Sequence, residues 1–312
     1  MRKFILILLL VFAVNLKAQD IHLSQFTVSK IGINPAIIGS QSTDYKVTFQ
    51  KRTQWVSVAN PFSTIVFGVE IRDILKNTSM SFQFINDVSG DASFTTSQFN
   101  SGINKVFSID KGKQISAGIL LGVAQRKVDF SQLVFEEVEQ LQDPSFTFFD
   151  IGIGGNYSNI VNKEFSFFSG FSMFHINKPK QTLINNDDVI LEEKHNIYFL
   201  SFYRLNSTLI FNPALLYTRQ GKSAELLAGS GVRYRLKKNT NLIARLFYRW
   251  NDAIIPAFGV NYNSVTAVMS YDLNTSDLIA ASDYKGGFEF SLIYIWNKKK
   301  RVEKNKFCPK YL

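Results

Sequence analysis

Residues 287–296 read GFEFSLIYIW, and every second residue from Phe288 to Trp296 is large and apolar. The residues between them are mixed and include Glu289 and Ser291. Successive side chains of an extended chain point to opposite faces, so this stretch predicts a strand with one apolar and one mixed face. It ends on an aromatic residue and resembles the terminal assembly signal of bacterial outer-membrane barrels, although a further 16 residues follow it.

The same alternation recurs along most of the chain, for example at 63–72, 114–124 and 149–157. Helical periodicity is scarce, and turn-forming residues separate the alternating segments. The sequence therefore predicts an all-β fold of about 14 strands. The approximate strand ranges are 44–55, 62–72, 78–87, 93–107, 113–127, 147–158, 164–176, 194–204, 207–219, 223–236, 240–250, 253–263, 264–273 and 285–296.

Two architectures fit many strands of this length: a soluble sandwich or propeller, and a membrane barrel. Tyrosine and tryptophan residues lie near the ends of many predicted strands, as in the aromatic girdles at bilayer interfaces. The face opposite the apolar one is rich in Gly, Ser, Asn and Arg, and no repeat of about 40–50 residues indicates a propeller. We therefore predict a transmembrane antiparallel β-barrel, whose strands need about 9–11 residues each.

The N-terminus has the form of a secretory signal. Arg2 and Lys3 precede an unbroken apolar run from Phe4 to Val14, which is too short to span a bilayer. A cleavage point follows Ala18, so residues 1–18 are predicted to be a cleaved signal peptide. Together with the barrel pattern, export places the protein in the outer membrane.

Most of the positive charge lies in one short tail. The formal net charge is +10, with 46% hydrophobic and 19% charged residues, which excludes a disordered charged chain. The tail at 297–312 carries seven Lys and Arg residues against Glu303. The body of the chain is nearly neutral and has no basic stripe, so nucleic-acid binding is not expected.

The predicted organisation has four parts. These are the signal peptide at 1–18, an N-terminal segment at 19–43, the barrel at 44–296 and the basic tail at 297–312. A barrel of this size has a lumen wider than its own side chains fill, so the segment at 19–43 is a candidate plug. An even number of strands predicts that both termini are periplasmic.

No catalytic, cofactor or metal site is expected. His22, His175 and His195 lie in three separate segments, and Cys308 is the single cysteine. No nucleophile elbow or dinucleotide-binding motif occurs. The sequence thus favours a non-enzymatic protein.

Four arginines form the most suggestive polar set. Arg233, Arg235, Arg245 and Arg249 fall on the polar face of two adjacent predicted strands. An arginine facing lipid at mid-depth costs about 2–4 kcal/mol, so we expect these four to face the lumen. Two roles stay open: an ion-pair lattice with carboxylates such as Glu289, or a basic wall that holds the N-terminal segment or a cargo segment.

Short motifs along the mature chain, in a consistent order, resemble one known family. The motifs are QDIHLSQF at 19–26, NPA at 34–36, Gly39, RTQW at 52–55, Pro61-Phe62, DIGIG at 150–154 with Asn156-Tyr157, Phe171-Ser172 with His175, KGGFE at 285–289, and Cys308-Pro309. Their order and spacing are similar to those of PorP/SprF-like proteins, outer-membrane proteins of the type IX secretion system in Bacteroidetes. The motif residues to which the resemblance gives a structural or partner-binding role are Gln25, Phe26, Asn34, Pro35, Arg52 and Trp55.

The resemblance implies a barrel that works with a secretion machine and is not an enzyme. Members resembling the SprF branch pair with one large secreted protein, often an adhesin, through its C-terminal sorting domain, and support its export or hold it at the surface. Members resembling the PorP branch contact periplasmic ring and peptidoglycan-linking proteins. The residues do not separate the branches, and a diffusion channel or apolar-ligand transporter stays a third alternative.

Overall fold

The computed structural model describes residues 20–54, 61–90, 93–129, 145–181, 189–276 and 285–298. The predicted signal peptide at 1–18, Trp55 and the tail beyond Lys298 lie outside these residues. Two short 3-10 turns come first, η1 (Lys30–Gly32) and η2 (Pro35–Ile37). The strands are β1 (Tyr45–Gln54), β2 (Phe62–Leu75), β3 (Thr78–Ser89), β4 (Phe94–Asp110), β5 (Lys113–Lys127), β6 (Ser145–Ile160), β7 (Phe165–Phe174), β8 (Lys194–Arg204), β9 (Leu209–Gln220), β10 (Ser223–Lys237), β11 (Thr240–Arg249), β12 (Ala253–Tyr262), β13 (Val265–Asn274) and β14 (Lys285–Trp296).

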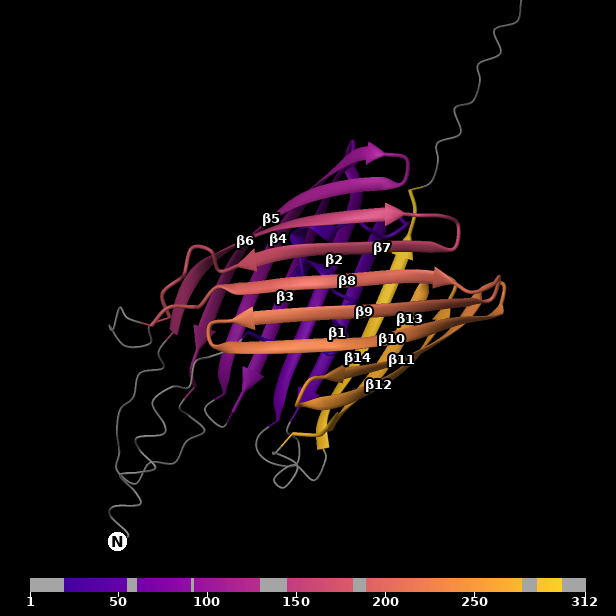
Figure 1. Cartoon of the computed structure of the whole chain (residues 1–312). Helices are drawn as coiled ribbons and strands as arrows, with labels where there is room; N and C mark the ends of the chain where they lie inside the picture. The colour runs from indigo at the N-terminus through magenta and orange to yellow at the C-terminus, as the bar shows by residue number, and fades with distance from the viewer. Residues whose placement is uncertain are drawn as a thin grey trace, which may run out of the picture.

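The strands form one closed antiparallel barrel (Figure 1). Each strand pairs with its neighbours in sequence, and β1 pairs with β14 to close the sheet, with Tyr45 opposite Trp296. Closure gives both outer strands a partner and leaves no exposed edge. The predicted 14-strand antiparallel β-barrel is therefore confirmed.

The barrel wall buries polar residues and exposes apolar ones. In β1 the inward-facing Thr48, Gln50 and Arg52 are 3%, 0% and 1% exposed. In β5 the inward Leu120 is 2% exposed and the outward Leu121 next to it is 58% exposed. This pattern is the reverse of a soluble sandwich and is typical of a barrel whose outer face meets lipid. Among the described residues, no helix is both long and apolar enough to cross a bilayer.

The two rims of the barrel differ. At the rim where β1 begins and β14 ends, short turns such as Lys76–Asn77 and Lys111–Gly112 join the strands. Gly112 has φ +80°, a backbone conformation that glycine adopts without strain. At the other rim the connections include the long segments 128–144 and 175–193. We call these the short-turn rim and the long-loop rim; in outer-membrane barrels they face the periplasm and the exterior respectively.

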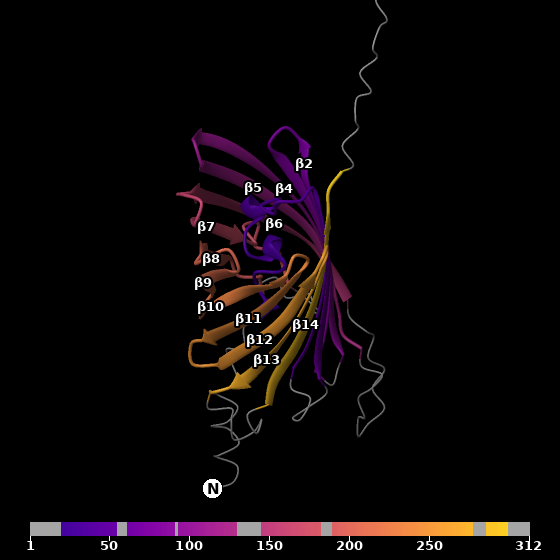
Figure 2. The same cartoon turned by 90° about the vertical axis from the view of Figure 1, so that its right-hand side faces the viewer.

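Residues 20–44 run through the barrel interior from one rim to the other (Figure 2). At the long-loop rim the Asp20 backbone N–H donates to Gln220 Oε1 over 2.8 Å. At the short-turn rim the Asp44 carbonyl accepts from Arg72 N, and its carboxylate accepts from Lys298 N. The described chain thus begins at the long-loop rim, whereas β14 ends at the short-turn rim. The expectation that both ends share the periplasmic side was wrong for this segment, because strand parity places strand ends only.

Candidate functional site

The lumen is occupied by residues 20–44, whose apolar side chains form the interior core. Phe26, Ile33 and Ile37 are 5%, 3% and 2% exposed. They cluster with inward-facing residues of β8, β9, β10, β11 and β12. Phe26 also packs edge-on against Phe247, with ring centroids 5.5 Å apart. Burying each such side chain contributes about 1.5–3 kcal/mol to the stability of the folded state. This part of the lumen is therefore packed like the hydrophobic core of a folded domain.

Asn34-Pro35-Ala36 fits against glycines of the wall. Asn34 Oδ1 accepts from the Ala36 N–H over 2.7 Å and caps η2, in which Pro35 is the first residue. Its Nδ2 donates to the carbonyls of Gly155 and Phe171, both over 3.0 Å. The short side chain and the proline make a compact corner, which the wall accommodates with glycine. A Cβ built on Gly154 would collide with Asn34, and one on Gly118 would collide with Pro35.

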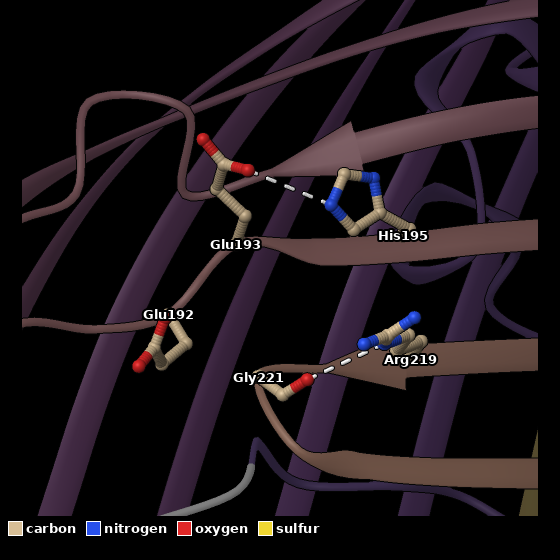
Figure 3. Close-up of a pocket in the computed structure, with 5 residues that line it drawn as sticks. All are labelled: Glu192, Glu193, His195, Arg219 and Gly221. Carbon is tan, nitrogen blue, oxygen red and sulfur yellow. Dashed lines mark hydrogen bonds and ion pairs between the residues drawn. The ribbon is translucent and has the colours of Figure 1, made fainter.

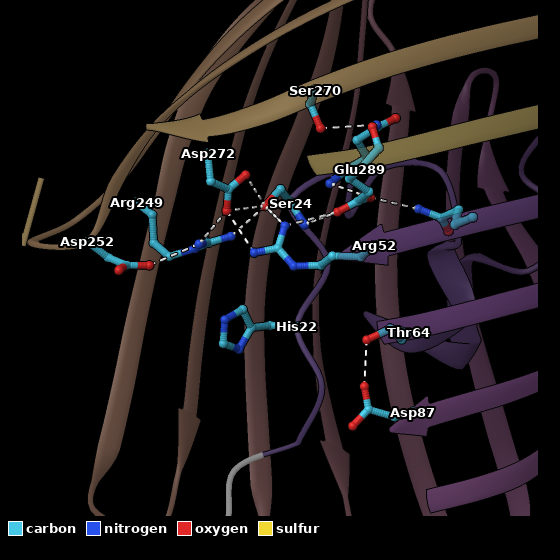
Figure 4. Close-up of polar contacts among 12 residues, drawn as sticks. His22, Ser24, Arg52, Thr64, Asp87, Arg249, Asp252, Ser270, Asp272 and Glu289 are labelled. Carbon is cyan, nitrogen blue, oxygen red and sulfur yellow. Dashed lines mark hydrogen bonds and ion pairs between the residues drawn. The ribbon is translucent and has the colours of Figure 1, made fainter. Parts of the chain in front are cut away.

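A buried ion-pair network surrounds Ser24 (Figure 4). Ser24 Oγ donates to Asp272 over 2.8 Å and accepts from Arg52 and Arg249 over 2.6 and 2.8 Å. Arg52 pairs with Asp272 at 2.8 Å and with Glu289 at 3.3 Å. Arg249 also pairs with Asp272, at 3.0 Å. Two arginines and two carboxylates thus balance each other around one hydroxyl, which offsets much of the penalty of burying charge.

The backbone of residues 24 and 25 is bound by the last strand. Ser24 N and Gln25 N donate to the two oxygens of Glu289, over 2.8 and 3.1 Å. Gln25 Nε2 donates to Ser270 Oγ and to the Glu289 carbonyl, over 3.1 and 3.0 Å. Gln50 also donates to Glu289, over 3.1 Å. The network therefore joins the N-terminal segment to β1, β13 and β14, the strands at the closing seam.

A second charged cluster lies at the long-loop rim. The His175 ring nitrogens lie 2.8 Å from Asp150 and 2.7 Å from Asp20, and Lys194 is 3.3 Å from Asp20. Burial lowers the pKa of His175, but the two carboxylates outweigh it and raise this pKa to about 9. Burial would raise the pKa of Asp20, yet His175 and Lys194 hold it well below its ordinary value. His175 is therefore a cation between two anions at neutral pH.

A third ion pair holds the segment near the short-turn rim. Lys46 Nζ lies 2.7 Å from Glu70 and donates to the Val28 carbonyl over 2.6 Å. Glu70 accepts from the Gly39 N–H over 3.2 Å. Both ends of this pair thus bind backbone atoms of the N-terminal segment, which explains why two charges are buried on the inner faces of β1 and β2.

The structure brings most of the predicted motif residues into this lumen. Gln25, Phe26, Asn34, Pro35 and Arg52 are all buried at the contact between the N-terminal segment and the wall. Trp55 lies outside the described residues. Arg52 donates to Ser24 of the first motif, 28 positions earlier in the sequence. Gln25 and Asn34 bind other wall residues, Glu289 and the carbonyls of Gly155 and Phe171 among them.

The four predicted wall arginines share the inner face but not one environment. By strand register, Arg249 lies opposite Leu227 and Arg245 opposite Gly231 on β10. Arg249 is buried in the Ser24 network, whereas Arg245 is half-buried and reaches Thr27 Oγ1 at 3.4 Å. Arg233 and Arg235 are exposed in the lumen towards the short-turn rim. Only Arg249 takes part in the ion-pair lattice, and its partners are Asp272, Glu225 and Asp252.

Sequence reasoning missed the partners Ser24, Asp272 and Asp20. The signal that could have found Asp272 is its position: it is the single carboxylate on the inward parity of β13, in line with Ser270. A carboxylate at that position needs a buried cation opposite it. Which cation it meets depends on barrel closure, which strand patterns alone do not give.

A surface pocket of about 350 Å³ lies at the long-loop rim, lined by residues of the β7–β8 connection, β8, the end of β9 and the β9–β10 turn (Figure 3). His195 is 3.6 Å from Glu193, and Arg219 donates to the Gly221 carbonyl over 3.4 Å. The described residues contain no group of three His, Cys, Asp or Glu side chains that could hold a metal ion. The pocket offers an ion pair and a backbone contact.

Comparison with known proteins adds the family. The model of the type IX secretion system membrane protein PorP/SprF matches residues 15–294. The chain belongs to the PorP/SprF family. The resemblance of the sequence motifs is thus confirmed, and the family match includes the N-terminal segment as well as nearly all of the barrel. A search of curated protein sequences finds no match.

Solved structures with a similar fold are outer-membrane barrels. The Ralstonia pickettii toluene transporter TbuX aligns with TM-score 0.52 and 10% identity, covering 87% of this chain and 94% of that chain. The monoaromatic hydrocarbon channel CymD aligns with TM-score 0.51 and 9% identity, covering 87% and 93%. At these identities the likeness shows the barrel fold alone.

Proposed function

We propose that this PorP/SprF family member is a non-enzymatic outer-membrane barrel that binds a secreted partner through the partner's C-terminal sorting domain. Binding supports the export of that partner or anchors it at the cell surface. Family membership supports a role in type IX secretion, and the barrel fold supports a place in the outer membrane. In this proposal residues 1–18 are a cleaved signal peptide that directs export.

The occupied lumen is the observation that carries the proposal. Residues 20–44 contact the inner face all around the barrel, by polar contacts to β1–β8, β11, β13 and β14 and by the apolar cluster to β9, β10 and β12. We propose that this segment acts as a plug. A plugged barrel has no path for a folded or extended cargo, so it serves secretion by docking partners at its rims.

Two alternatives make different predictions. A core machine component would bind periplasmic ring proteins, and the start of the basic tail at the short-turn rim favours this as the second candidate. A diffusion channel or apolar-ligand transporter is supported only by the fold of the neighbours. It would require the Ser24 and His175 clusters, which tie the segment to the wall, to come apart during transport.

Affinity purification of the tagged barrel from its native outer membrane in mild detergent tests the proposal. Mass spectrometry should identify one large secreted protein with a C-terminal sorting domain. Recovery of periplasmic ring proteins in its place would support the machine component. A barrel that purifies alone and conducts ions in planar bilayers would support the channel and overturn docking.

A further inference from the structure

The lumen wall near the short-turn rim carries arginines that have no carboxylate partner among the described residues. The basic vestibule, as we call it, consists of Arg204 on β8, Arg233 and Arg235 on β10, and Arg245 on β11. The described strands β8–β12 and the turns between them contain two carboxylates, Glu225 and Asp252. Both lie at the long-loop rim and pair with Arg249.

The strand register places the vestibule arginines on one inner surface. Arg204 and Arg233 both lie opposite Ile210, on either side of β9. Glu164, in the turn before β7, contacts Arg204 through its backbone carbonyl, which accepts the Arg204 N–H. Within the described residues, no carboxylate lies within 4 Å of a guanidinium nitrogen of Arg204, Arg233, Arg235 or Arg245.

The unbalanced charge contrasts with four other cations inside the barrel. Arg52, Arg249, Lys46 and His175 each meet at least one carboxylate within 3.3 Å. Arg204, Arg233 and Arg235 remain exposed instead. The segment in the lumen thus binds the charged groups around Ser24, His175 and Lys46, and leaves the arginines of β8 and β10 free for a ligand.

From this arrangement we propose that the basic vestibule binds an extended acidic segment of a protein partner, presented from the short-turn side. Two strand spacings put Arg204 and Arg233 about 10 Å apart, and Arg233 and Arg235 lie about 7 Å apart along β10. One phosphate cannot bridge that spread, whereas successive carboxylates of an extended acidic peptide can. The barrel wall separates these side chains from lipid headgroups.

The basic tail strengthens the choice of an acidic partner. The chain leaves the barrel at the same rim, where Lys298 N donates to Asp44. Residues 297–312 carry seven basic side chains and one acidic one, so the charge of the tail has the same sign as that of the vestibule. Both features favour a carboxylate-rich partner on this side, whether that partner is secreted cargo or part of the machine.

A peptide-binding measurement tests the proposal on the full-length barrel in lipid nanodiscs, where both rims are accessible. The probe is fluorescein-labelled hexaglutamate, followed by anisotropy at low salt. The triple variant Arg204→Gln, Arg233→Gln, Arg235→Gln should bind about tenfold more weakly, as expected when three partly solvated charge pairs are lost. Heat-modifiable migration on gels checks that the variant barrel is folded, which is expected because these three side chains are exposed.

Two controls separate the vestibule from general positive charge. The triple variant Lys127→Gln, Arg219→Gln, Lys222→Gln removes the same charge from exposed positions at the long-loop rim and should bind as the wild type does. A variant lacking 299–312 should keep most of the affinity. Wild-type affinity in the vestibule variant, or loss of binding on removal of the tail alone, would overturn the proposal. So would competition by inorganic phosphate as strong as that by unlabelled hexaglutamate.

Discussion

Arg52 of β1 and Glu289 of β14 face each other across the strand pair that closes the barrel, with Arg52 Nη1 3.3 Å from Glu289 Oε2. Both side chains are buried, and both bind Ser24 of the N-terminal segment. The same residues therefore close the sheet and fix the segment in the lumen. Closure of the barrel and occupation of the lumen are coupled, because each provides the partners that the other needs.

Replacing Arg52 with Gln should destabilise the barrel strongly. The change leaves Asp272 and Glu289 buried with one cation between them, and breaking a buried ion pair costs about 3–5 kcal/mol. Urea unfolding in lipid vesicles, followed by tryptophan fluorescence, measures the loss. Arg204→Gln is the matched control, since Arg204 is exposed and should leave the unfolding free energy nearly unchanged. Equal midpoints for the two variants would mean that the seam contact contributes nothing.

The His175 cluster should make stability depend on pH. The folded-state pKa of His175 is raised from 6.5 to about 9 by Asp20 and Asp150 against the effect of burial. A raised pKa means that the stabilisation is fully present below pH 6.5 and is lost as pH rises through about 9. The low pKa of Asp20 keeps its negative charge throughout this range.

The measurement is the difference in unfolding free energy between wild type and His175→Gln from about pH 5.5 to about pH 10. This range extends roughly one pH unit beyond the ordinary and the folded-state pKa of His175. The difference should be largest at the acid end and shrink towards the alkaline end. A difference that grows with pH would show that His175 is neutral in the folded barrel. His195→Gln is the control, because that half-exposed side chain faces outward beside Arg219 and its contact with Glu193 is longer, at 3.6 Å.

Two neighbouring glycines of β6 should respond differently to the same substitution. A Cβ at Gly154 collides with Asn34, whereas one at Gly155 meets nothing within 4 Å. Gly154→Val should therefore push η2 away from the wall, lower the unfolding midpoint and raise ion conductance in planar bilayers. Gly155→Val should leave conductance low. Equal conductance in both variants and the wild type, with a folded Gly154→Val barrel, would contradict the plug.

The barrel could be predicted because apolar and polar residues alternate along the sequence with the period of a β-strand. Alternation at 114–124 and 287–296 has the same period as the side chains of a strand, so the inner and outer faces follow without knowledge of the partner strands. The contacts of the lumen could not be predicted in the same way. Ser24, Arg52 and Asp272 come from distant segments, and their meeting depends on the register of the closed sheet.

The four predicted wall arginines show what strand patterns alone do not predict. The pattern placed all four side chains on one face, and they share the inner face. It could not tell Arg249, which is buried among carboxylates, from Arg233, which is exposed, because that difference depends on where residues 20–44 pass. The same path reversed the expected side of the N-terminal end, since a rule for strand ends says nothing about a segment that crosses the lumen.

The path of the segment predicts that the N-terminal end is accessible outside the cell. Asp20 lies beside Gln220 and His175 at the long-loop rim, which in outer-membrane barrels faces the exterior. An epitope inserted between Gln19 and Asp20 should bind antibody on intact cells, whereas an epitope after Leu312 should bind only after the outer membrane is permeabilised.

Labelling of the first epitope only after permeabilisation would place the long-loop rim in the periplasm or the segment outside the lumen. An epitope in the β6–β7 turn at Asn162 distinguishes these two outcomes, because that turn lies at the short-turn rim. If the intact cells label at Asn162, the barrel is inverted; if they do not, the segment does not cross the lumen.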